Sequence, residues 1–188
     1  SSFSNVNDLN KSVTPELSNS DTTLLHLWAH SDKYRLGGSA LYQSFKLYGG
    51  ATPDIDNANQ FKVLFEATQE LLDKDFIEAL HDISDGGLIT SLIEMALCSN
   101  QGLDINLDYS DKEQLVPKLF SEEIGLVIEV KNEKLESVRN YLNEKELFFE
   151  NIAKKNDKKK ININCFKEEV FSEDLNTLFN QWSKVSHE

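Results

Sequence analysis

The chain has 188 residues, of which 39% are hydrophobic, so it is long enough to bury a core as one domain. Its formal net charge of −13 argues against nucleic-acid binding, which needs a basic surface for the phosphate backbone. No apolar run approaches the roughly 20 residues of a membrane-spanning helix, and the polar first twenty positions do not resemble a signal peptide. Because the chain starts at Ser1 and contains only one methionine, Met95, we interpret it as a piece of a longer polypeptide.

Strand-like and helix-like segments alternate along the chain. After a strand tail at 1–6 and a turn around Pro15, strands are predicted at 22–29, 76–80, 102–107, 124–130, 148–153 and 160–166. Helices are predicted at 39–48, 56–73, 88–97, 112–120, 133–143 and 173–184. The alternation predicts an α/β or α+β fold, with helices covering a mixed sheet, and a single domain over residues 1–188.

Capping residues and apolar spacing add detail to three of these helices. Asp56 is the expected N-cap of the 56–73 helix, and Gly49-Gly50 is expected to end the helix before it. The expected inner face of the 56–73 helix contains Phe61, Leu64, Phe65, Thr68, Leu71 and Leu72. The expected inner face of the last helix contains Leu175, Leu178, Phe179 and Trp182.

The cysteines and most of the histidines suggest no ligand site. Cys98 lies on an apolar helical stripe and Cys165 in a strand, so both are expected to be buried thiols in a reducing, cytoplasmic setting. His26, His30 and His187 fit no metal-ligand spacing. The lysine-rich segment 154–160 lies between two predicted strands and is interpreted as a solvated hairpin turn rather than a binding patch.

The most informative segment is His-Asp-Ile-Ser-Asp-Gly-Gly-Leu at 81–88, between a predicted strand and an apolar helix. Ligands of α/β proteins tend to lie at such turns. Asp82 offers a hard oxygen ligand for Mg²⁺, and the hydroxyl of Ser84 can donate to a phosphate oxygen. Gly86 and Gly87 could let backbone amides approach phosphate at a helix start, or could serve only a tight turn.

Local structure offers a second interpretation of the same residues. Asp82 could be a loop carboxylate that caps the next helix, although Asp85 is better placed for that role. His81 could act as an acid or base, but a hydrogen-bonded structural histidine is the more common case. The segment 37–39, Gly-Gly-Ser, also precedes a predicted helix. The two glycine-led helix starts could share a ligand, or their similarity could be coincidence.

Several ordered segments together resemble one family, the large single-chain form of phosphoribosylformylglycinamidine synthase. They are KSVTPELS at 11–18, LGGSAL at 36–41, PDID at 53–56, HDISDGGL at 81–88, EMA at 94–96, GLDI at 102–105, FSEEIG at 120–125 and VFSE at 170–173. The motif HDxSDGGL alone would indicate only the wider group of ATP-using purine enzymes and selenophosphate synthetase. A selenophosphate synthetase would leave the KSVTPELS and FSEE segments unexplained.

The resemblance implies a domain like the C-terminal domain of AIR synthase, here the carboxyl-type subdomain of the second synthase half. The family converts formylglycinamide ribonucleotide, glutamine and ATP into formylglycinamidine ribonucleotide in purine biosynthesis. The implied partners are the other synthase subdomains and a glutaminase domain of the same polypeptide. That domain's machinery is absent here, so neither Cys98 nor Cys165 is its nucleophile, no catalytic residue is assigned, and the fragment alone is expected to be inactive.

The resemblance also implies roles for the central motif. Asp82 corresponds to a magnesium ligand and Ser84 to a contact with bound ATP or ADP, with Gly86 and Gly87 shaping the same site. The remaining magnesium ligands are expected in the preceding subdomain, and Glu122 and Glu123 are interpreted as structural or interfacial. In the alternative hypothesis the chain is a scaffold module, and its nucleotide is structural and not hydrolysed.

Overall fold

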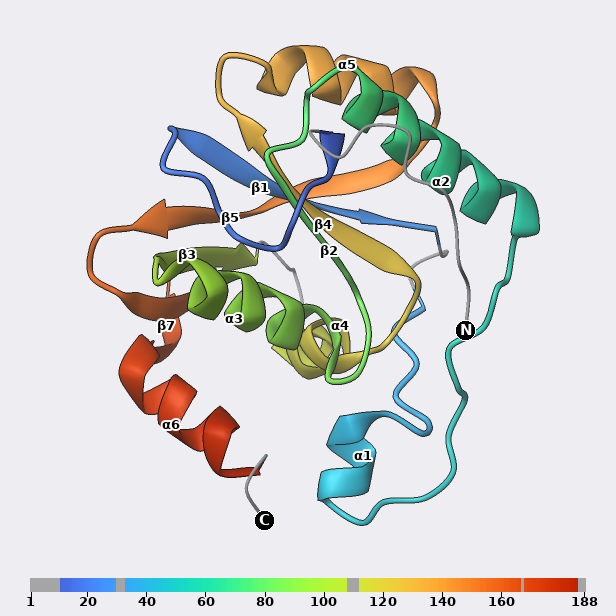
Figure 1. The fold of residues 1–188 in the computed structure, drawn as a ribbon. Coiled ribbons are helices and arrows are strands. Elements are labelled where there is room, and N and C mark those ends of the chain that lie inside the picture. The colour runs from blue at the N-terminus through green and yellow to red at the C-terminus, as the bar shows by residue number, and fades with distance from the viewer. Residues whose placement is uncertain (1–10, 30–32, 108–111, 167, 186–188) are drawn as a thin grey trace.

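The computed structural model describes residues 11–29, 33–107, 112–166 and 168–185 and contains a seven-stranded sheet between layers of helices (Figure 1). The strand order is β2-β4-β1-β5-β3-β6-β7. β3 and β6 are parallel, whereas the other neighbouring pairs are antiparallel. The expectation of helices on a mixed sheet is therefore confirmed. The strands are β1 (Thr22–Trp28), β2 (Ala79–Asp82), β3 (Gly102–Leu107), β4 (Gly125–Lys131), β5 (Phe148–Asn156), β6 (Lys160–Cys165) and β7 (Glu168–Asp174).

Helices cover both faces of the sheet and bury a separate core on each (Figure 1). Strand β1 is buried along its whole length and serves both cores: Leu24 packs towards α3, and Leu25 and Leu27 pack towards α2 and α5. A strand covered on both faces is apolar without alternation, which explains its sequence TTLLHLW. The helices are α1 (Ala40–Ser44), α2 (Ala58–Asp73), α3 (Gly87–Ser99), α4 (Leu115–Phe120), α5 (Leu135–Glu144) and α6 (Leu175–Val185), with a short 3₁₀ turn, η2 (Lys112–Gln114), before α4.

Several predictions about helix ends and inner faces are wrong. Asn57, not Asp56, caps α2, since its side chain accepts from two amides of the first turn, and Asp56 pairs with Lys33 and Arg35 instead. Phe61 and Phe65 are exposed, because the buried stripe of α2 follows a different line. That stripe contains Leu64, Ala67, Thr68 and Leu71.

Two further differences concern α1 and the segment before β2. Helix α1 ends at Ser44, and Gly49-Gly50 lies in the loop beyond it with positive φ angles rather than at the helix end. Strand β2 starts at Ala79, later than expected, because Asp75 has a positive φ and the amide of Phe76 donates back to α2.

The C-terminal part contains an unexpected strand and an exposed aromatic pair. β7 is not among the predicted strands, because its sequence EEVFSED is acidic and has no apolar run, as suits a strand at the edge of the sheet. In α6, Leu175 is buried as expected, but Phe179 and Trp182 are 50% and 52% exposed.

Cys165 is buried as predicted, whereas the prediction for Cys98 is wrong, because its side chain lies on the outer side of α3.

Two of the remaining predictions concern residues that the structure leaves undescribed. The strand tail at 1–6 and the histidines His30 and His187 lie outside the described residues. Among the residues that are described, no helix combines the length and the apolarity that crossing a bilayer requires.

Candidate functional site

The segment 81–88 forms a turn from β2 into α3, as predicted. β2 ends at Asp82, and the amide of Ile83 donates to the carbonyl of Gly125, which keeps the turn beside β4. The carboxylate of Asp82 is 70% exposed, and Ser84 is exposed as well. The turn therefore presents a carboxylate and a hydroxyl to solvent at the end of the edge strand β2.

Gly86 and Gly87 give this turn its shape. Their φ angles of 88° and 74° lie in the left-handed region that favours glycine. A Cβ on Gly87 would lie 2.7 Å from the carbonyl oxygen of Ser121, so the turn packs directly on the backbone after α4. The prediction that Asp85 caps α3 is wrong: Gly86 occupies the cap position, and no side chain bonds to the first-turn amides.

The two glycine-led helix starts do lie together, and a carboxylate of the chain itself joins them. Oε1 of Glu122 accepts a hydrogen bond from the amide of Gly86 at 2.8 Å and another from the amide of Ala40 at 2.8 Å. The amide of Gly87 donates to the carbonyl of Ser84 at 2.9 Å. Both amides of the glycine pair therefore have partners within the protein.

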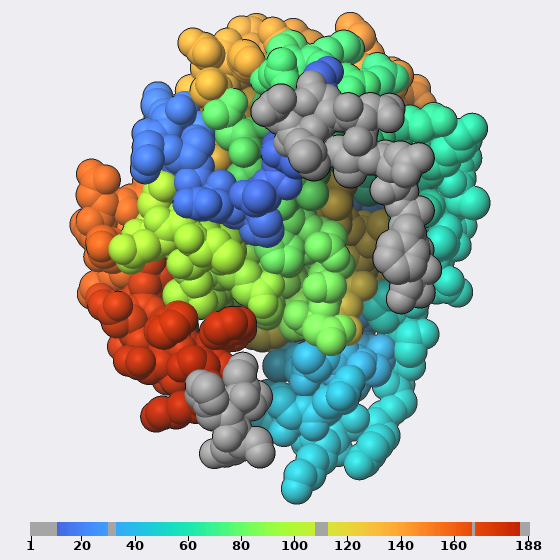
Figure 2. Space-filling view, viewed as in Figure 1, coloured from blue at the N-terminus to red at the C-terminus, as the bar shows by residue number. Residues whose placement is uncertain are grey.

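Glu123, the next residue, holds the segment 35–57 against the sheet. Its carboxylate accepts from Nε of Arg35 at 2.6 Å and from the second guanidinium nitrogen at 2.8 Å. Arg35 also pairs with Asp56, and these hydrogen bonds, that of Glu123 above all, raise the pKa of Arg35 despite its desolvation. We call residues 35–57 the arm; in Figure 2 it projects below the other layers in cyan.

His81 is held on both sides of its ring. Nδ1 lies 2.7 Å from the carbonyl oxygen of Asp82, and Nε2 lies 3.1 Å from a carboxylate oxygen of Glu94. The side chain is only 14% exposed. This arrangement suits a structural histidine that fixes the end of β2 on α3.

His26, which has no ligand spacing in the sequence, lies in a buried charged group. Its Nδ1 is 3.2 Å from Glu150, and Glu150 also pairs with the buried ammonium of Lys118. Burial lowers the pKa of His26, and the positive charge of Lys118 acts in the same direction. The group fills the interior between β1, β5 and α4, and sequence spacing gave no sign of it.

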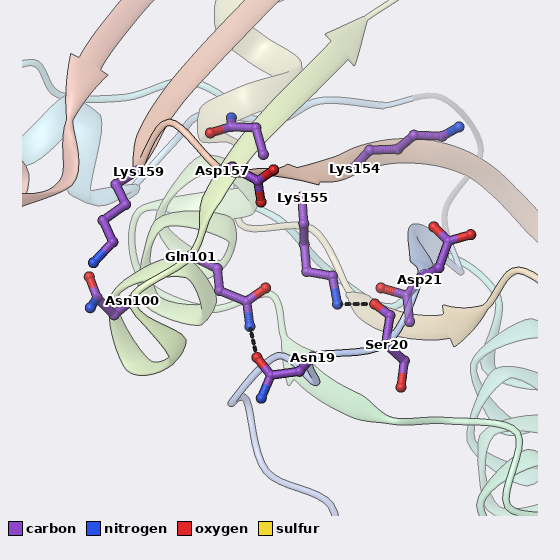
Figure 3. Close-up of a pocket in the computed structure, with 11 residues that line it drawn as sticks. Asn19, Ser20, Asp21, Asn100, Gln101, Lys154, Lys155, Asp157 and Lys159 are labelled. Atoms are coloured by element: carbon purple, nitrogen blue, oxygen red, sulfur yellow. Dashed lines mark hydrogen bonds between the residues drawn. The ribbon is translucent and has the colours of Figure 1, made fainter.

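A cavity lies beside Asn100 and Gln101, just past the end of α3 that is opposite Asp82 (Figure 3). It has a volume of about 530 Å³, and the lysine-rich segment 154–160 forms one wall with Lys154, Lys155 and Lys159. Lys155 is bound within the protein, since its ammonium donates to Ser20 and to the carboxylate of Glu129. The segment connects β5 to β6 as a turn, but the prediction of a hairpin is wrong, because β3 lies between these two strands in the sheet. The cavity is separate from the central motif.

A smaller cavity of about 350 Å³ lies beside the motif. His81 and Glu94 line it together with the exposed Cys98 and the aromatic side chains of Phe179 and Trp182. It lies between α3 and α6, which are neighbours on the surface shown in Figure 2. Within the described ranges, no group of three or more His, Cys, Asp or Glu side chains could hold a metal ion.

Comparisons with known proteins identify relatives of this architecture. Residues 28–165 match the family described as AIR synthase related protein, C-terminal domain. The chain is 36% identical over 181 residues to a probable phosphoribosylformylglycinamidine synthase, chloroplastic/mitochondrial, of Arabidopsis thaliana. That match covers 95% of the chain and 13% of the plant protein, so the chain spans about an eighth of its relative.

Solved structures share the fold at lower sequence identity. PurL of T. maritima complexed with FGAR superposes with a TM-score of 0.75 and 17% identity, over 90% of this chain and 30% of that one. The same protein complexed with ATP gives a TM-score of 0.72 and 16% identity, over 90% and 27%. E. coli HypE, a hydrogenase maturation protein, gives 0.59 and 19%, over 87% and 52%. At these identities the likeness concerns the fold alone.

Proposed function

Because the chain belongs to the phosphoribosylformylglycinamidine synthase family, as a domain of the AIR synthase C-terminal type, we propose that it is part of an ATP-dependent ligase of purine biosynthesis. The whole enzyme would convert formylglycinamide ribonucleotide, glutamine and ATP into formylglycinamidine ribonucleotide. Relatives whose structures are described as complexed with ATP, ADP or FGAR support this assignment. The domain would belong to the second synthase half.

The contribution of this chain would be one side of a magnesium-nucleotide site. The carrying observation is the exposed pair of Asp82 and Ser84, which lies where β2 turns into α3. A carboxylate oxygen suits Mg²⁺, which is usually held by one or two carboxylates together with phosphate oxygens. Asp82 would hold the ion, whose charge offsets that of the phosphates when it is bound, and the hydroxyl of Ser84 would donate to a phosphate oxygen.

Gly86 and Gly87 would support this site by shape. Their amides are engaged by Glu122 and Ser84, so their main role would be the tight turn that exposes the hydroxyl of Ser84. One carboxylate alone holds Mg²⁺ poorly, and further ligands would come from another subdomain of the same polypeptide. The half-exposed aromatics Phe179 and Trp182 suit contact with such a neighbour.

The location and the glutaminase partner belong to the same proposal. We expect the enzyme to work in the cytoplasm, although the plant relative is named for the chloroplast or mitochondrion. Ammonia would come from a glutaminase domain outside this chain, and no catalytic residue is assigned within it.

The test is calorimetric titration of Mg·ADP into the full-length protein, compared with Asp82→Asn. We expect the substitution to abolish one binding event, because the amide is a weaker ligand for the cation. Asp85→Asn is the matched control, since it removes the same charge from the same exposed turn and should leave binding intact. Equal binding in the wild type and Asp82→Asn would refute the assignment of Asp82.

The scaffold hypothesis has one observation in its favour and can be separated in the same experiment. The amides at both glycine-led helix starts are already bonded within the protein, as expected of a rigid module. If Asp82→Asn lowers the melting temperature of the nucleotide-loaded protein while glutamine-dependent turnover continues, the nucleotide is structural. If turnover is lost while that melting temperature is unchanged, the site belongs to the reaction.

A further inference from the structure

Glu122 occupies an unusual position between two separate backbone segments. One oxygen of its carboxylate accepts both the amide of Gly86, at the start of α3, and the amide of Ala40, at the start of α1. A carboxylate at the N-terminus of the 13-residue helix α3 is also favoured by the helix dipole. Glu122 thus fills, from within the protein, a place that a ligand oxygen could otherwise take.

The backbone that carries Glu122 is fixed on both sides. Before it, the carbonyl of Ser121 lies so close to Gly87 that no Cβ fits between them. After it, Glu123 is buried and bonded to the guanidinium of Arg35. The position of the Glu122 carboxylate is therefore set before any ligand arrives.

The hydrogen bond to Gly86 determines the turn that presents Ser84. The amide of Gly87, the next residue, donates to the carbonyl of Ser84, so the turn is closed on itself and attached to Glu122 by one further bond. Without the carboxylate, the amides of Gly86 and Ala40 lose their acceptor, and the arm and the turn lose their shared contact. The exposed hydroxyl of Ser84 would then adopt several orientations.

We propose that Glu122 is a positioning residue for the nucleotide site, which holds the Ser84 turn and the arm in the geometry that receives phosphate. The inference rests on the proposed function, because it assigns Glu122 a role in that same site. Glu122 itself touches neither nucleotide nor metal. Its effect depends on where its oxygen lies, and not on its negative charge.

Two conservative variants separate position from charge. Glu122→Gln keeps an acceptor oxygen at the same distance along the side chain and removes the charge. Glu122→Asp keeps the charge but is one methylene shorter, so its oxygen cannot reach both amides. Glu144→Gln is the control, because Glu144 is an exposed carboxylate at the end of α5.

The experiment is titration of Mg·ADP into the full-length protein, with amide hydrogen exchange of Gly86 and Ala40 measured without nucleotide. We expect Glu122→Asp to weaken binding about tenfold, as is common when a supporting hydrogen bond behind a metal site is removed. The exchange of both amides should accelerate in that variant. Glu122→Gln and Glu144→Gln should bind nearly as the wild type does.

Each other outcome overturns a defined part of this account. If Glu122→Gln binds weakly and Glu122→Asp normally, charge is what matters and the positioning role is wrong. If Asp82-dependent binding persists at full strength in Glu122→Asp while amide exchange accelerates, the contact is only structural and the inference fails alone. If wild-type binding is insensitive to Asp82→Asn, the proposed function fails and the role of Glu122 fails with it.

Discussion

Two carboxylates on one pair of adjacent strands have opposite surroundings. Glu129 of β4 lies opposite Ala79 of β2, and Asp82 lies at the end of the same strand, opposite Leu126. The side chain of Glu129 is completely buried, whereas that of Asp82 is 70% exposed. This strand pair therefore has a closed end, where Glu129 is buried, and an open end, where Asp82 faces solvent.

The two carboxylates differ in the hydrogen bonds that their oxygen atoms accept. Glu129 accepts from the backbone amide of Ser18 at 2.8 Å, from the hydroxyl of Thr22 at 2.6 Å and from the ammonium of Lys155 at 2.7 Å. Asp82 has His81 beside it, 3.5 Å from Nδ1, and is otherwise turned to solvent. A carboxylate whose hydrogen-bonding capacity is filled can only stabilise the fold, while an exposed one at a strand end can bind a ligand.

The largest effect is expected at the closed end. Glu129→Ala should lower the free energy of unfolding by about 3–5 kcal/mol, because breaking a buried ion pair leaves Lys155 without its carboxylate. Glu129→Gln should cost less than Glu129→Ala, since its amide oxygen still accepts hydrogen bonds from the surrounding donors. Urea unfolding followed by circular dichroism measures both. A loss below 1 kcal/mol for Glu129→Ala would contradict the view that this end is held by the carboxylate.

The second effect concerns the turn at the open end. Gly87→Ala should cost about 3 kcal/mol, because the left-handed backbone strain of about 1 kcal/mol adds to overpacking against Ser121. Gly49→Ala is the matched control, because the φ of Gly49, 88°, lies in the same left-handed region as the 74° of Gly87, and nothing lies within 4 Å of an added Cβ. Its cost should be the strain alone, about 1 kcal/mol. Equal losses in the two variants would show that the contact with Ser121 is unimportant.

The open end could be predicted from the sequence better than the contacts behind it. The strand, the glycine turn and the apolar helix are local features, so the position of Asp82 and Ser84 at a strand-to-helix turn followed from residues 76–97. The bonds from Glu122 to Gly86 and Ala40 join segments that are distant in sequence. No periodicity or spacing encodes such a contact, and only the folded chain reveals it.

The same limit applies to the fold. β1 and β4 were predicted because buried strands are continuous apolar runs, whereas β7 is an acidic edge strand without such a run. Hydrophobicity is also a poor guide at Phe61 and Phe65, which are exposed on α2 although the pattern places them on its inner face. A lone chain can leave large apolar residues at its surface, so an apolar side chain alone does not identify the inner face.

A third, smaller effect comes from the buried pair of His26 and Glu150. Burial lowers the pKa of His26, so the folded state resists its protonation, and stability should fall as the pH drops below the ordinary value of 6.5. Burial acts to raise the pKa of Glu150, but the hydrogen bond with His26 and the charge of Lys118 outweigh it and lower the pKa. The contribution of Glu150 is thus present above its ordinary pKa of 4.5 and is lost only at lower pH.

The measurement is the urea midpoint between pH 7.5 and pH 5. The wild type should lose stability through this range, and His26→Gln should flatten the decline because it removes the titrating ring. An unchanged pH profile in His26→Gln would show that the decline arises elsewhere.

The smallest effect on stability is expected where the effect on ligand binding is largest. Asp82→Asn should change the free energy of unfolding of the nucleotide-free protein by no more than about 0.5 kcal/mol, as is usual for an exposed side chain. Urea unfolding alongside Glu129→Gln gives the direct comparison, since both replace a carboxylate on the same strand pair by its amide. If Asp82→Asn proves as costly as Glu129→Gln, then Asp82 is a structural carboxylate too, and its exposure is no sign of a ligand site.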